Sequence, residues 1–485
     1  MTGLDPPRRL PPERWAVADF FDARAPERMR WIERNAYFYA CDRAYMRFLV
    51  PEGLSVLEVG CGNGQLLAAL RPSRGVGVDI SARMVEAARA LWPDLEFICG
   101  DIEDPEFCAG LPGPFDVIVV SDTVGHLTDC QTTFAALRRL LPPEGRIVIA
   151  YYQRWLEPVL KVARRLGLQM PQLAQNWLTT DDIMNLLALA DFEPVRREWR
   201  QLLPRRLGGL GPLVNRFVAP LPGIRRLCLR NYVVARPLAG AVPAEELPSV
   251  SVVVPCRNER GNIEAAIRRM PRFALRMEII FVEGHSADGT FEECVRVRDA
   301  HPEWDIKVLR QTGRGKADAV RLGFASASGD ILMILDADLT VPPEALPKFY
   351  DVLVRRKGEF ANGTRLVYTM EKGAMRALNF LANRGFARIF SYLINQRFTD
   401  ALCGTKALWR RDYEKIAAGR RYFGEFDPFG DFDLIFGAAK LSLKIVEVPV
   451  RYARRSYGTT QISRFADGWL LMRMVGFAWM KLKAL

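Results

Sequence analysis

The sequence holds 485 residues, of which 49% are hydrophobic and 26% are charged. This composition is typical of a folded globular protein and excludes a disordered chain, and the length exceeds what one hydrophobic core usually serves, so we expect two or more domains. Lysine and arginine outnumber aspartate and glutamate by 68 to 56, a formal net charge of +12. Such an excess favours an anionic partner, whether a nucleic acid, a phospholipid surface or a phosphorylated substrate.

The cysteine and histidine pattern predicts free thiols and no structural zinc site. Nine cysteines are scattered without a C-x-x-C pair, and the three histidines are not clustered. Free thiols are typical of a reducing cytoplasm. The first residues lack the apolar segment of a signal peptide, and no uncharged apolar run reaches the ~20 residues that cross a bilayer. We therefore expect a cytoplasmic protein without a membrane span.

Strand-like and helix-like segments alternate through the first half of the chain, which predicts a parallel, doubly wound α/β sheet. A long segment of leucines and arginines, 201–230, separates the last two strands. It fits a substrate lid, a membrane-surface element or a packed helical excursion. The predicted strands are 55–59, 76–80, 96–98, 116–120, 146–150, 192–199 and 231–236, with helices at 82–92 and 131–141 among others.

A second α/β alternation begins at Val250. Residues 237–248 are rich in proline and alanine and lack periodicity, so we place a linker at 239–248, between a domain of residues 1–238 and a domain of residues 249–485. The predicted strands of the second domain are 250–255, 278–282, 306–309, 331–335 and 445–450.

The first strand of the chain runs into a glycine turn that suits a small ligand. The turn, residues 60–64, reads GCGNG. Glycines tolerate positive φ and let backbone N–H groups approach a ligand. Gln65 stands where a dinucleotide fingerprint has its third glycine, which argues against a dinucleotide. Asp79 closes the next strand, where it is placed to accept from two ribose hydroxyls, and Asp101 follows the third.

These features together resemble the class I S-adenosylmethionine-dependent methyltransferases over roughly residues 40–150. The resemblance implies a Rossmann-like domain whose glycine turn holds the amino-acid end of S-adenosylmethionine. A hydroxyl acceptor would need a general base, and His126 either serves as that base or caps a loop. The implied cofactor-binding residues are Glu58, Gly60, Gly62, Gly64, Asp79 (for the ribose) and Asp101 (for the adenine amine).

The second half carries a pair of carboxylates at the end of an apolar strand. Residues 331–335 read ILMIL and are followed by Asp336 and Asp338. The carboxyl edge of such a sheet is where α/β proteins bind ligands. Side chains at i and i+2 project to one side, so the two acids can share Mg²⁺ or Mn²⁺ with a diphosphate.

Residues 249–465 resemble the family-two, GT-A-fold glycosyltransferases, and within them the polyprenyl-phosphate (dolichol-phosphate mannose type) synthases. The resemblance implies a metal site at Asp336 and Asp338, and catalytic roles for Asp338 and Asp433. It places the nucleoside-diphosphate sugar on Pro255, Arg257, Glu259, Glu283, Lys316, Asp336 and Asp338. The sequence departs from the family at its first turn, EGHS in place of DDGS, and lacks the lysine that often follows the C-terminal arginine–tyrosine–glycine loop.

The same resemblance suggests a lipid phosphate as the sugar acceptor. A phosphomonoester is mostly anionic at neutral pH and attacks without a base, but it needs arginines to place it. The residues implied for this role are Arg365, Arg384, Arg388 and Arg455. Two amphipathic segments, 374–398 and the C-terminal 469–480, suggest peripheral attachment to an anionic membrane, at the inner face of the cell membrane.

The sequence therefore predicts a bifunctional enzyme. One half transfers a sugar, with metal and with inversion, and the other transfers a methyl group to an unidentified acceptor. A second possibility is a glycosyltransferase acting on a glycan or other hydroxyl, with a methyltransferase-like half that only binds cofactor or a partner. A third is a non-catalytic adaptor for nucleic acid or membrane; the intact acidic motifs argue against it, and no recognised nucleic-acid motif is present.

Overall fold

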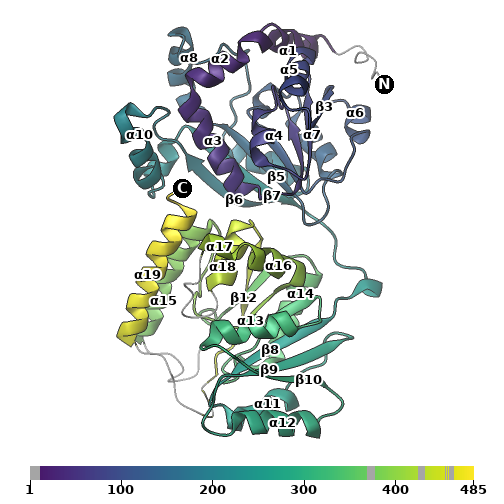
Figure 1. The fold of residues 1–485 in the computed structure, drawn as a ribbon, viewed down its shortest axis with the longest axis vertical. Coiled ribbons are helices and arrows are strands. Elements are labelled where there is room, and N and C mark those ends of the chain that lie inside the picture. The colour runs from purple at the N-terminus through teal and green to yellow at the C-terminus, as the bar shows by residue number, and fades with distance from the viewer. Residues whose placement is uncertain (1–10, 369–376, 424–431, 454, 456, 458–463) are drawn as a thin grey trace. The chain divides into compact units, whose positions relative to one another are not determined.

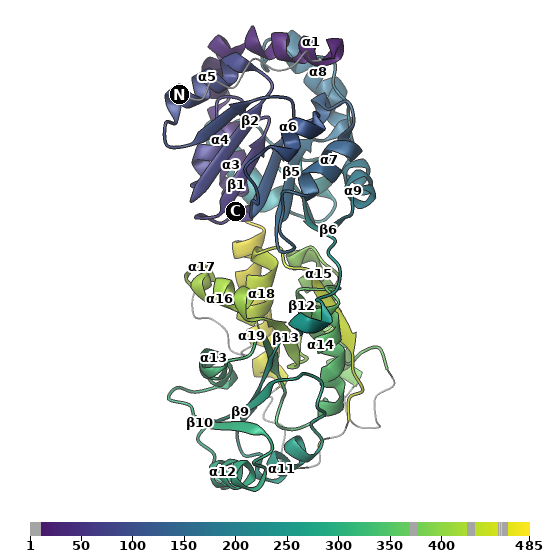
Figure 2. The ribbon, with the colours of Figure 1, turned by 90° about the vertical axis from the view of Figure 1, so that its right-hand side faces the viewer.

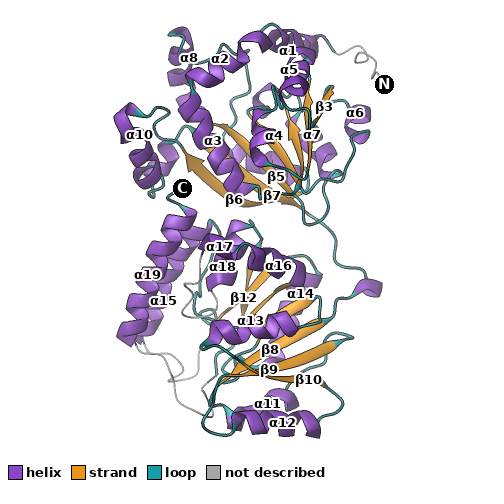
Figure 3. Ribbon diagram, viewed as in Figure 1, coloured by secondary structure: helices purple, strands orange, loops and turns teal. Residues whose placement is uncertain are grey.

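The chain forms two compact units, Met1–Ala239 and Gly240–Lys483, each built on a seven-stranded mixed sheet (Figures 1 and 3). The computed structural model describes residues 11–368, 377–423, 432–453, 455, 457 and 464–485, with only the backbone of 377–382 and 464–468. Among these residues no helix is both long and apolar enough to cross a membrane.

The first sheet has the strand order β3-β2-β1-β4-β5-β7-β6. Strands β1 to β5 are parallel, but β7 runs antiparallel to both of its neighbours. The expectation of an all-parallel sheet is therefore wrong for β7, because the long segment after β6 returns the chain into the slot beside β5. The strands are β1 Ser55–Val59, β2 Arg74–Asp79, β3 Glu96–Cys99, β4 Val117–Ser121, β5 Arg146–Tyr152, β6 Phe192–Arg200 and β7 Arg230–Pro237.

Helices cover both faces of this sheet (Figure 2). Helices α3, α4 and α5 lie on one face, and α6, α7 and α9 bury apolar side chains against the other. Because helices cover both faces of the sheet, its buried strands carry apolar side chains on both sides. The helices are α1 Pro12–Asp22, α2 Arg28–Arg34, α3 Ala36–Leu49, α4 Gln65–Leu70, α5 Ala82–Leu91, α6 Pro105–Ala109, α7 Cys130–Arg138, α8 Glu157–Arg165, α9 Thr180–Leu189 and α10 Leu210–Leu213.

The second sheet has the order β10-β9-β8-β11-β13-β12-β14. Its strand β13 runs antiparallel to β11 and β12. The strands predicted from the sequence include neither β13 nor β12, in which Gly363 and Thr364 lie in register with β14. The strands are β8 Val250–Cys256, β9 Met277–Glu283, β10 Asp305–Arg310, β11 Ile331–Ile334, β12 Phe360–Thr364, β13 Lys406–Trp409 and β14 Ile445–Pro449.

Helices α11, α12 and α14 pack on one face of the second sheet, and α13 lies on the other (Figure 2). Gly323 of α13 allows the close approach, since a Cβ there would meet the side chain of Val253. The helices are α11 Arg260–Arg268, α12 Thr290–Ala300, α13 Lys316–Ser326, α14 Leu346–Val354, α15 Ala377–Ile394, α16 Arg410–Ala418, α17 Arg420–Phe423, α18 Phe432–Lys440 and α19 Arg464–Leu482.

One fully buried arginine ties the first sheet to the helix before it. Arg230 opens β7 and is wholly inaccessible. Its guanidinium contacts Asp42 of α3, with a shortest N–O distance of 3.1 Å, and also pairs with Asp122, which follows β4. Burial alone would lower the pKa of Arg230, but these two carboxylates outweigh it and raise the pKa. Arg230 therefore offsets part of the negative charge of two carboxylates that come from separate elements.

Replacing Arg230 should destabilise the first unit strongly. Arg230→Met leaves two carboxylates without their cation, and an uncompensated buried charge typically costs about 3–5 kcal/mol. The free energy of unfolding, measured by urea titration, should fall by that order. Arg47→Met, on the exposed side of α3, is the matched control and should change it little. Equal losses in the two variants would contradict a structural role for the buried network.

Candidate active sites

A pocket opens at the glycine turn that joins β1 to α4. Gly60, Gly62 and Gly64 all have positive φ, of 71°, 53° and 74°. A Cβ on Gly60 would collide with Thr123, whereas a Cβ on Gly62 would meet nothing within 4 Å. The turn therefore packs tightly on one side and leaves open space over Gly62, where its backbone faces the pocket.

Asp79 lies at the carboxyl end of β2, beside this turn. One carboxylate oxygen accepts from the backbone N–H of Gly62 at 2.7 Å, and the other from that of Ser81 at 2.9 Å. Burial raises the pKa of Asp79, and these two N–H groups offset part of the rise. Asp79 thus lines the pocket and also fixes the turn, so its carboxylate has a structural partner besides any ligand.

Glu58 is buried beneath the turn. Its carboxylate accepts from the backbone N–H of Leu67 at 2.9 Å, in the first turns of α4. Burial raises the pKa of Glu58 to about 8, with that N–H opposing the shift. Glu58 is therefore largely protonated at neutral pH in the structure.

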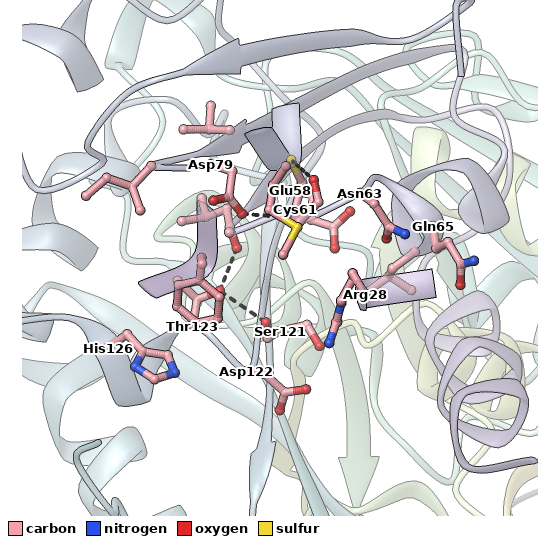
Figure 4. A pocket seen from close by; sticks show the side chains of 18 of the residues that line it. Arg28, Glu58, Cys61, Asn63, Gln65, Asp79, Ser121, Asp122, Thr123 and His126 are labelled. Carbon is pink, nitrogen blue, oxygen red and sulfur yellow. Dashed lines mark hydrogen bonds between the residues drawn. The ribbon is translucent and has the colours of Figure 1, made fainter. Parts of the chain in front are cut away.

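Arg28 and Asp122 are among the charged lining residues that were not assigned from the sequence. Arg28 comes from α2, and its guanidinium donates to the Tyr39 hydroxyl at 3.4 Å. Asp122 follows β4 with a positive φ of 60°. Figure 4 shows Arg28 reaching between Gln65 and Asp122, over the turn. Arg28 lies in a helix before the first strand, so no sequence motif indicated it. The positive φ of Asp122 is seen only in the structure.

Asp101 does not open onto the pocket in this structure. It is buried, and both its carboxylate oxygens accept from Arg14 of α1, at 2.7 and 2.9 Å. Arg14, rather than Asp101, is among the lining residues. The helix that carries Arg14 lies far upstream of Asp101, so the ion pair between them could not be predicted from the sequence.

His126 lines the same pocket at its opposite side (Figure 4). Its ring packs edge-on against Phe21, with 5.3 Å between ring centroids. Burial, with the nearby Arg14 guanidinium, lowers the pKa of His126 to about 4. The imidazole is therefore neutral at physiological pH but only weakly basic.

In the second unit, Asp336 and Asp338 follow β11 directly, and each meets a cation from another element. Asp336 pairs with Lys316 at the start of α13, with 2.6 Å between Oδ1 and Nζ. Asp338 pairs with Arg455 at 2.7 Å. Burial would raise the pKa of Asp336, but the Lys316 ammonium outweighs it and lowers that pKa. Asp336 is thus favoured in its ionised form, and each carboxylate has a cationic partner.

Two residues at the start of β13 complete this site, Gly404 just before the strand and Lys406 as its first residue, and the sequence did not single them out. A Cβ on Gly404 would collide with the Asp336 carboxylate and the Lys316 ammonium. Lys406 is fully buried, donates to the carbonyl of Cys403 and contributes to the lowered pKa of Asp336. A glycine before a short strand is a weak signal, because its neighbours come from elements far away in the sequence.

The residues implied for the donor nucleoside gather at the ends of β8 and β9. Pro255 is half-buried and Arg257 exposed, both at the end of β8. Glu259 is buried and accepts from Arg455 at 3.2 Å, so it shares that guanidinium with Asp338. Glu283 closes β9 and lies 3.6 Å from Arg310. The structure therefore brings these residues to one edge of the sheet, beside the acidic pair.

Two other predicted residues lie in ion pairs within the protein. Asp433, near the start of α18, accepts from Arg321 at 3.1 Å and from Arg420 at 3.2 Å. Arg365 is buried and binds Asp400 through two nitrogens, at 2.7 and 2.8 Å. Asp433, which the sequence assigned to catalysis, and Arg365, which it assigned to the acceptor phosphate, therefore already have partners within the protein. By contrast, Arg384 and Arg388 are exposed on α15.

Two family models match the chain. Residues 251–417 match "Glycosyl transferase family 2", and residues 31–197 match "Methyltransferase domain". The dolichol-phosphate mannosyltransferase of Pyrococcus furiosus is 37% identical over 220 residues, which cover 44% of this chain and 59% of that protein. The undecaprenyl-phosphate 4-deoxy-4-formamido-L-arabinose transferase of Erwinia tasmaniensis is 29% identical over 230 residues, covering 45% of this chain and 64% of that protein.

The chain thus spans about three-fifths of the length of these two relatives. Among solved structures, an S-adenosylmethionine-dependent methyltransferase of Thermotoga maritima aligns over 45% of this chain and 99% of its own, at 18% identity and a TM-score of 0.36. The two family models agree with the coarser part of both resemblances: residues 31–197 match a methyltransferase domain, and residues 251–417 match a family-two glycosyltransferase.

Proposed function

We propose that this protein is a bifunctional enzyme. Its second unit transfers a sugar from a nucleoside-diphosphate sugar to a polyprenyl phosphate, and its first unit transfers a methyl group from S-adenosylmethionine to a further acceptor. The observation that carries the proposal is the acidic pair after β11, in which Asp336 pairs with Lys316 and Asp338 with Arg455. Names of the relatives that act on lipid phosphates support the choice of acceptor.

The acidic pair suits a divalent metal that arrives with the substrate. Carboxylate oxygens are the ligands that Mg²⁺ and Mn²⁺ prefer. Among the described residues, however, no group of three or more histidine, cysteine, aspartate or glutamate side chains lies where it could hold a metal. Asp336 and Asp338 would therefore bind the ion jointly with diphosphate oxygens. When bound, the ion would neutralise charge on the leaving diphosphate.

The protein's own cations serve the same end. Lys316 and Arg455 already contact the two carboxylates, and both would face the diphosphate once the donor binds there. Glu259 and Glu283, with Pro255 and Arg257, would hold the nucleoside at the neighbouring strand ends. In this arrangement the acceptor oxygen attacks the anomeric carbon, the bond to the diphosphate breaks, and the configuration inverts.

A phosphate acceptor agrees with the state of Asp433. A hydroxyl acceptor would need a general base, but the Asp433 carboxylate already accepts from two guanidinium groups within the protein. A phosphomonoester needs no base. We assign its placement to Arg384 and Arg388, which are exposed on α15, and we assign Arg365, locked to Asp400, the role of ordering the loop after β12.

The second unit would meet its lipid substrate at a membrane surface. On α19, Trp469 is 70% exposed and Met472 52%, and Arg473 lies beside them. These residues occupy one face of the helix, while Leu471 and Met474 are buried. Exposed apolar side chains with nearby arginines are typical of helices that lie in a membrane interface. We propose peripheral attachment to the inner face of the cell membrane.

The first unit would hold S-adenosylmethionine over the glycine turn. Asp79 would accept from the ribose hydroxyls, Glu58 lies below the turn, and Arg28, one of three arginines that line the pocket, would pair with the carboxylate at the amino-acid end. The bound cofactor supplies an electrophilic methyl group, so the enzyme's main task is alignment. With a pKa near 4, His126 is a poor base, and a nucleophile that needs no strong base is favoured.

Removing one carboxylate of the acidic pair should abolish most sugar transfer. Asp338→Asn should lower the rate by more than ~100-fold, because metal-borne charge stabilisation is worth several kcal/mol. The assay combines a panel of nucleotide sugars, Mg²⁺ or Mn²⁺ and a short polyprenyl phosphate. Asp351→Asn, on the exposed side of α14, is the matched control. Full activity in excess chelator would contradict metal dependence.

Gly404→Ala should impair sugar transfer without unfolding the protein. The added methyl group would displace the ends of Asp336 and Lys316, which are flexible side chains rather than backbone. We expect a loss of about tenfold or more in kcat/KM, equivalent to about 1.4 kcal/mol, with the melting temperature nearly unchanged. Gly385→Ala is the control, since its Cβ would meet nothing. Unchanged kinetics in Gly404→Ala would show that the Asp336–Lys316 pair is not needed.

Asp79→Ala should weaken binding of S-adenosylmethionine at least about tenfold, since hydrogen bonds to a charged group are worth roughly 1.5–3 kcal/mol each. Isothermal titration of the full-length protein measures the change. Asp94→Ala, exposed in the same unit, should bind normally. A folded wild-type protein that gives no binding heat would contradict the methyl-transfer half of the proposal.

A further inference from the structure

The helix after β5 turns an apolar face outward. Trp155, Val159, Val162 and Leu166 recur at helical spacing through α8 and the turn before it, and they are 50%, 59%, 53% and 66% exposed. On the opposite side of the helix Leu160 is buried. Soluble proteins usually expose large apolar side chains one at a time, whereas here four of them lie in one exposed stripe.

The long segment between β6 and β7 presents a second exposed stripe. Leu207, Leu210, Leu213 and Phe217 are 56%, 55%, 58% and 39% exposed. The segment 202–229 also contains five arginines and no acidic residue. It is neither a buried helical excursion nor an ordinary polar loop, because its leucines face out and its charge has one sign.

The two stripes belong to one region of the first unit. The indole N–H of Trp155 donates to the carbonyl of Arg226 at 3.1 Å, and the Gln153 side chain donates to the same carbonyl at 3.4 Å. Figure 1 draws α8 and α10 at the outer edge of this unit. We call residues 154–166 and 205–227 together the leucine–arginine surface.

This surface is attached to the pocket at several points. Tyr152, just before α8, and Met170 and Gln172, just after it, all line the pocket. The Asn215 side chain donates to the hydroxyl of Tyr37 at 3.0 Å, in the same helix as the lining residue Tyr39. A binding partner on the leucine–arginine surface would therefore lie next to the pocket.

We propose that the leucine–arginine surface binds an anionic membrane, and that the methyl acceptor is a membrane-borne lipid or lipid-linked molecule. The second part rests on the proposed methyl transfer. Exposed leucines can enter the headgroup boundary while arginines pair with anionic headgroups, the mode of an interfacial helix. The acceptor's reactive group would then reach the pocket from the membrane side.

The charge pattern disfavours the other occupants of such a surface. A symmetric dimer brings the same patch of two copies together, and the one acidic residue of the leucine–arginine surface, Glu157, already pairs with Lys161 at 2.6 Å in its own helix. A nucleic acid would be bound by stacking aromatics between the arginines, but here the exposed apolar residues are mainly leucine and valine.

A local probe tests the membrane contact in the full-length protein. Leu166→Cys carries an environment-sensitive fluorophore, and Leu189→Cys, 56% exposed outside the surface, is the matched control. Labelled wild-type protein corrects for the partly exposed Cys41 and Cys99. With phosphatidylcholine–phosphatidylglycerol vesicles, emission from position 166 should rise and shift to the blue, and emission from 189 should not. An unchanged signal at 166 would overturn the proposal.

Charge variants distinguish binding through this surface from a general effect of the protein's net charge. The double variant Arg205→Gln with Arg226→Gln should bind anionic vesicles about fivefold more weakly per arginine. Arg47→Gln with Arg83→Gln removes the same charge elsewhere and should have little effect. Equal weakening in both doubles, or a lipid-free dimer broken by the first pair, would contradict the membrane assignment.

The acceptor class is read from methyl transfer. With methyl-labelled S-adenosylmethionine and vesicles of total membrane lipid, label should enter the organic extract, and less so in the Arg205/Arg226 variant. Label that enters only water-soluble products would overturn a lipid acceptor. Titration of S-adenosylmethionine on the same proteins distinguishes the two proposals: absent binding refutes methyl transfer itself, whereas normal binding without any response to vesicles refutes only this inference.

Discussion

The compensation of closely spaced carboxylates by cations from distant elements is the constraint on which both units depend. Asp336 and Asp338 stand two residues apart at the end of β11, and each is met by a cation, Lys316 or Arg455. In the first unit, Arg230 compensates Asp42 and Asp122 in the same way. Without those cations, like charges at the end of a buried strand would repel and lose hydration. The same cations are then available to a substrate diphosphate.

Backbone freedom is the second requirement, and glycine supplies it at a few positions. Gly62 leaves room over the first pocket, and Gly404 lets two charged side chains meet without a Cβ between them. The two sites therefore use one design. An apolar strand brings the backbone to the edge of the sheet, a glycine clears the space there, and polar groups from neighbouring strands complete the site. The two sites differ in the partners of their carboxylates: Asp79 accepts from the Gly62 N–H of the turn itself, whereas Asp336 and Asp338 pair with Lys316 and Arg455.

Local patterns predicted the strands and the two acidic motifs, because alternation and turn residues lie within a few positions of one another. The strands β12 and β13 were missed in part: Asn362 and Gly363 are poor strand formers, and pairing with the distant strands β13 and β14 places β12 in the sheet. The ion-pair partners of Asp101, Asp433 and Arg365 could not be predicted from the sequence either. Their partners Arg14, Arg321 and Asp400 lie 87, 112 and 35 residues away, and no local pattern links such positions.

Mass spectrometry of the sugar-transfer product tests the central claim most directly. The full-length protein is incubated with a nucleotide-sugar panel, a divalent metal and a mixture of a short polyprenyl phosphate and the matching polyprenol. The account predicts that one sugar is added to the phosphate and none to the alcohol, with the anomeric configuration inverted relative to the donor. Transfer to the polyprenol or to a glycan hydroxyl instead, or retention of configuration, would contradict it.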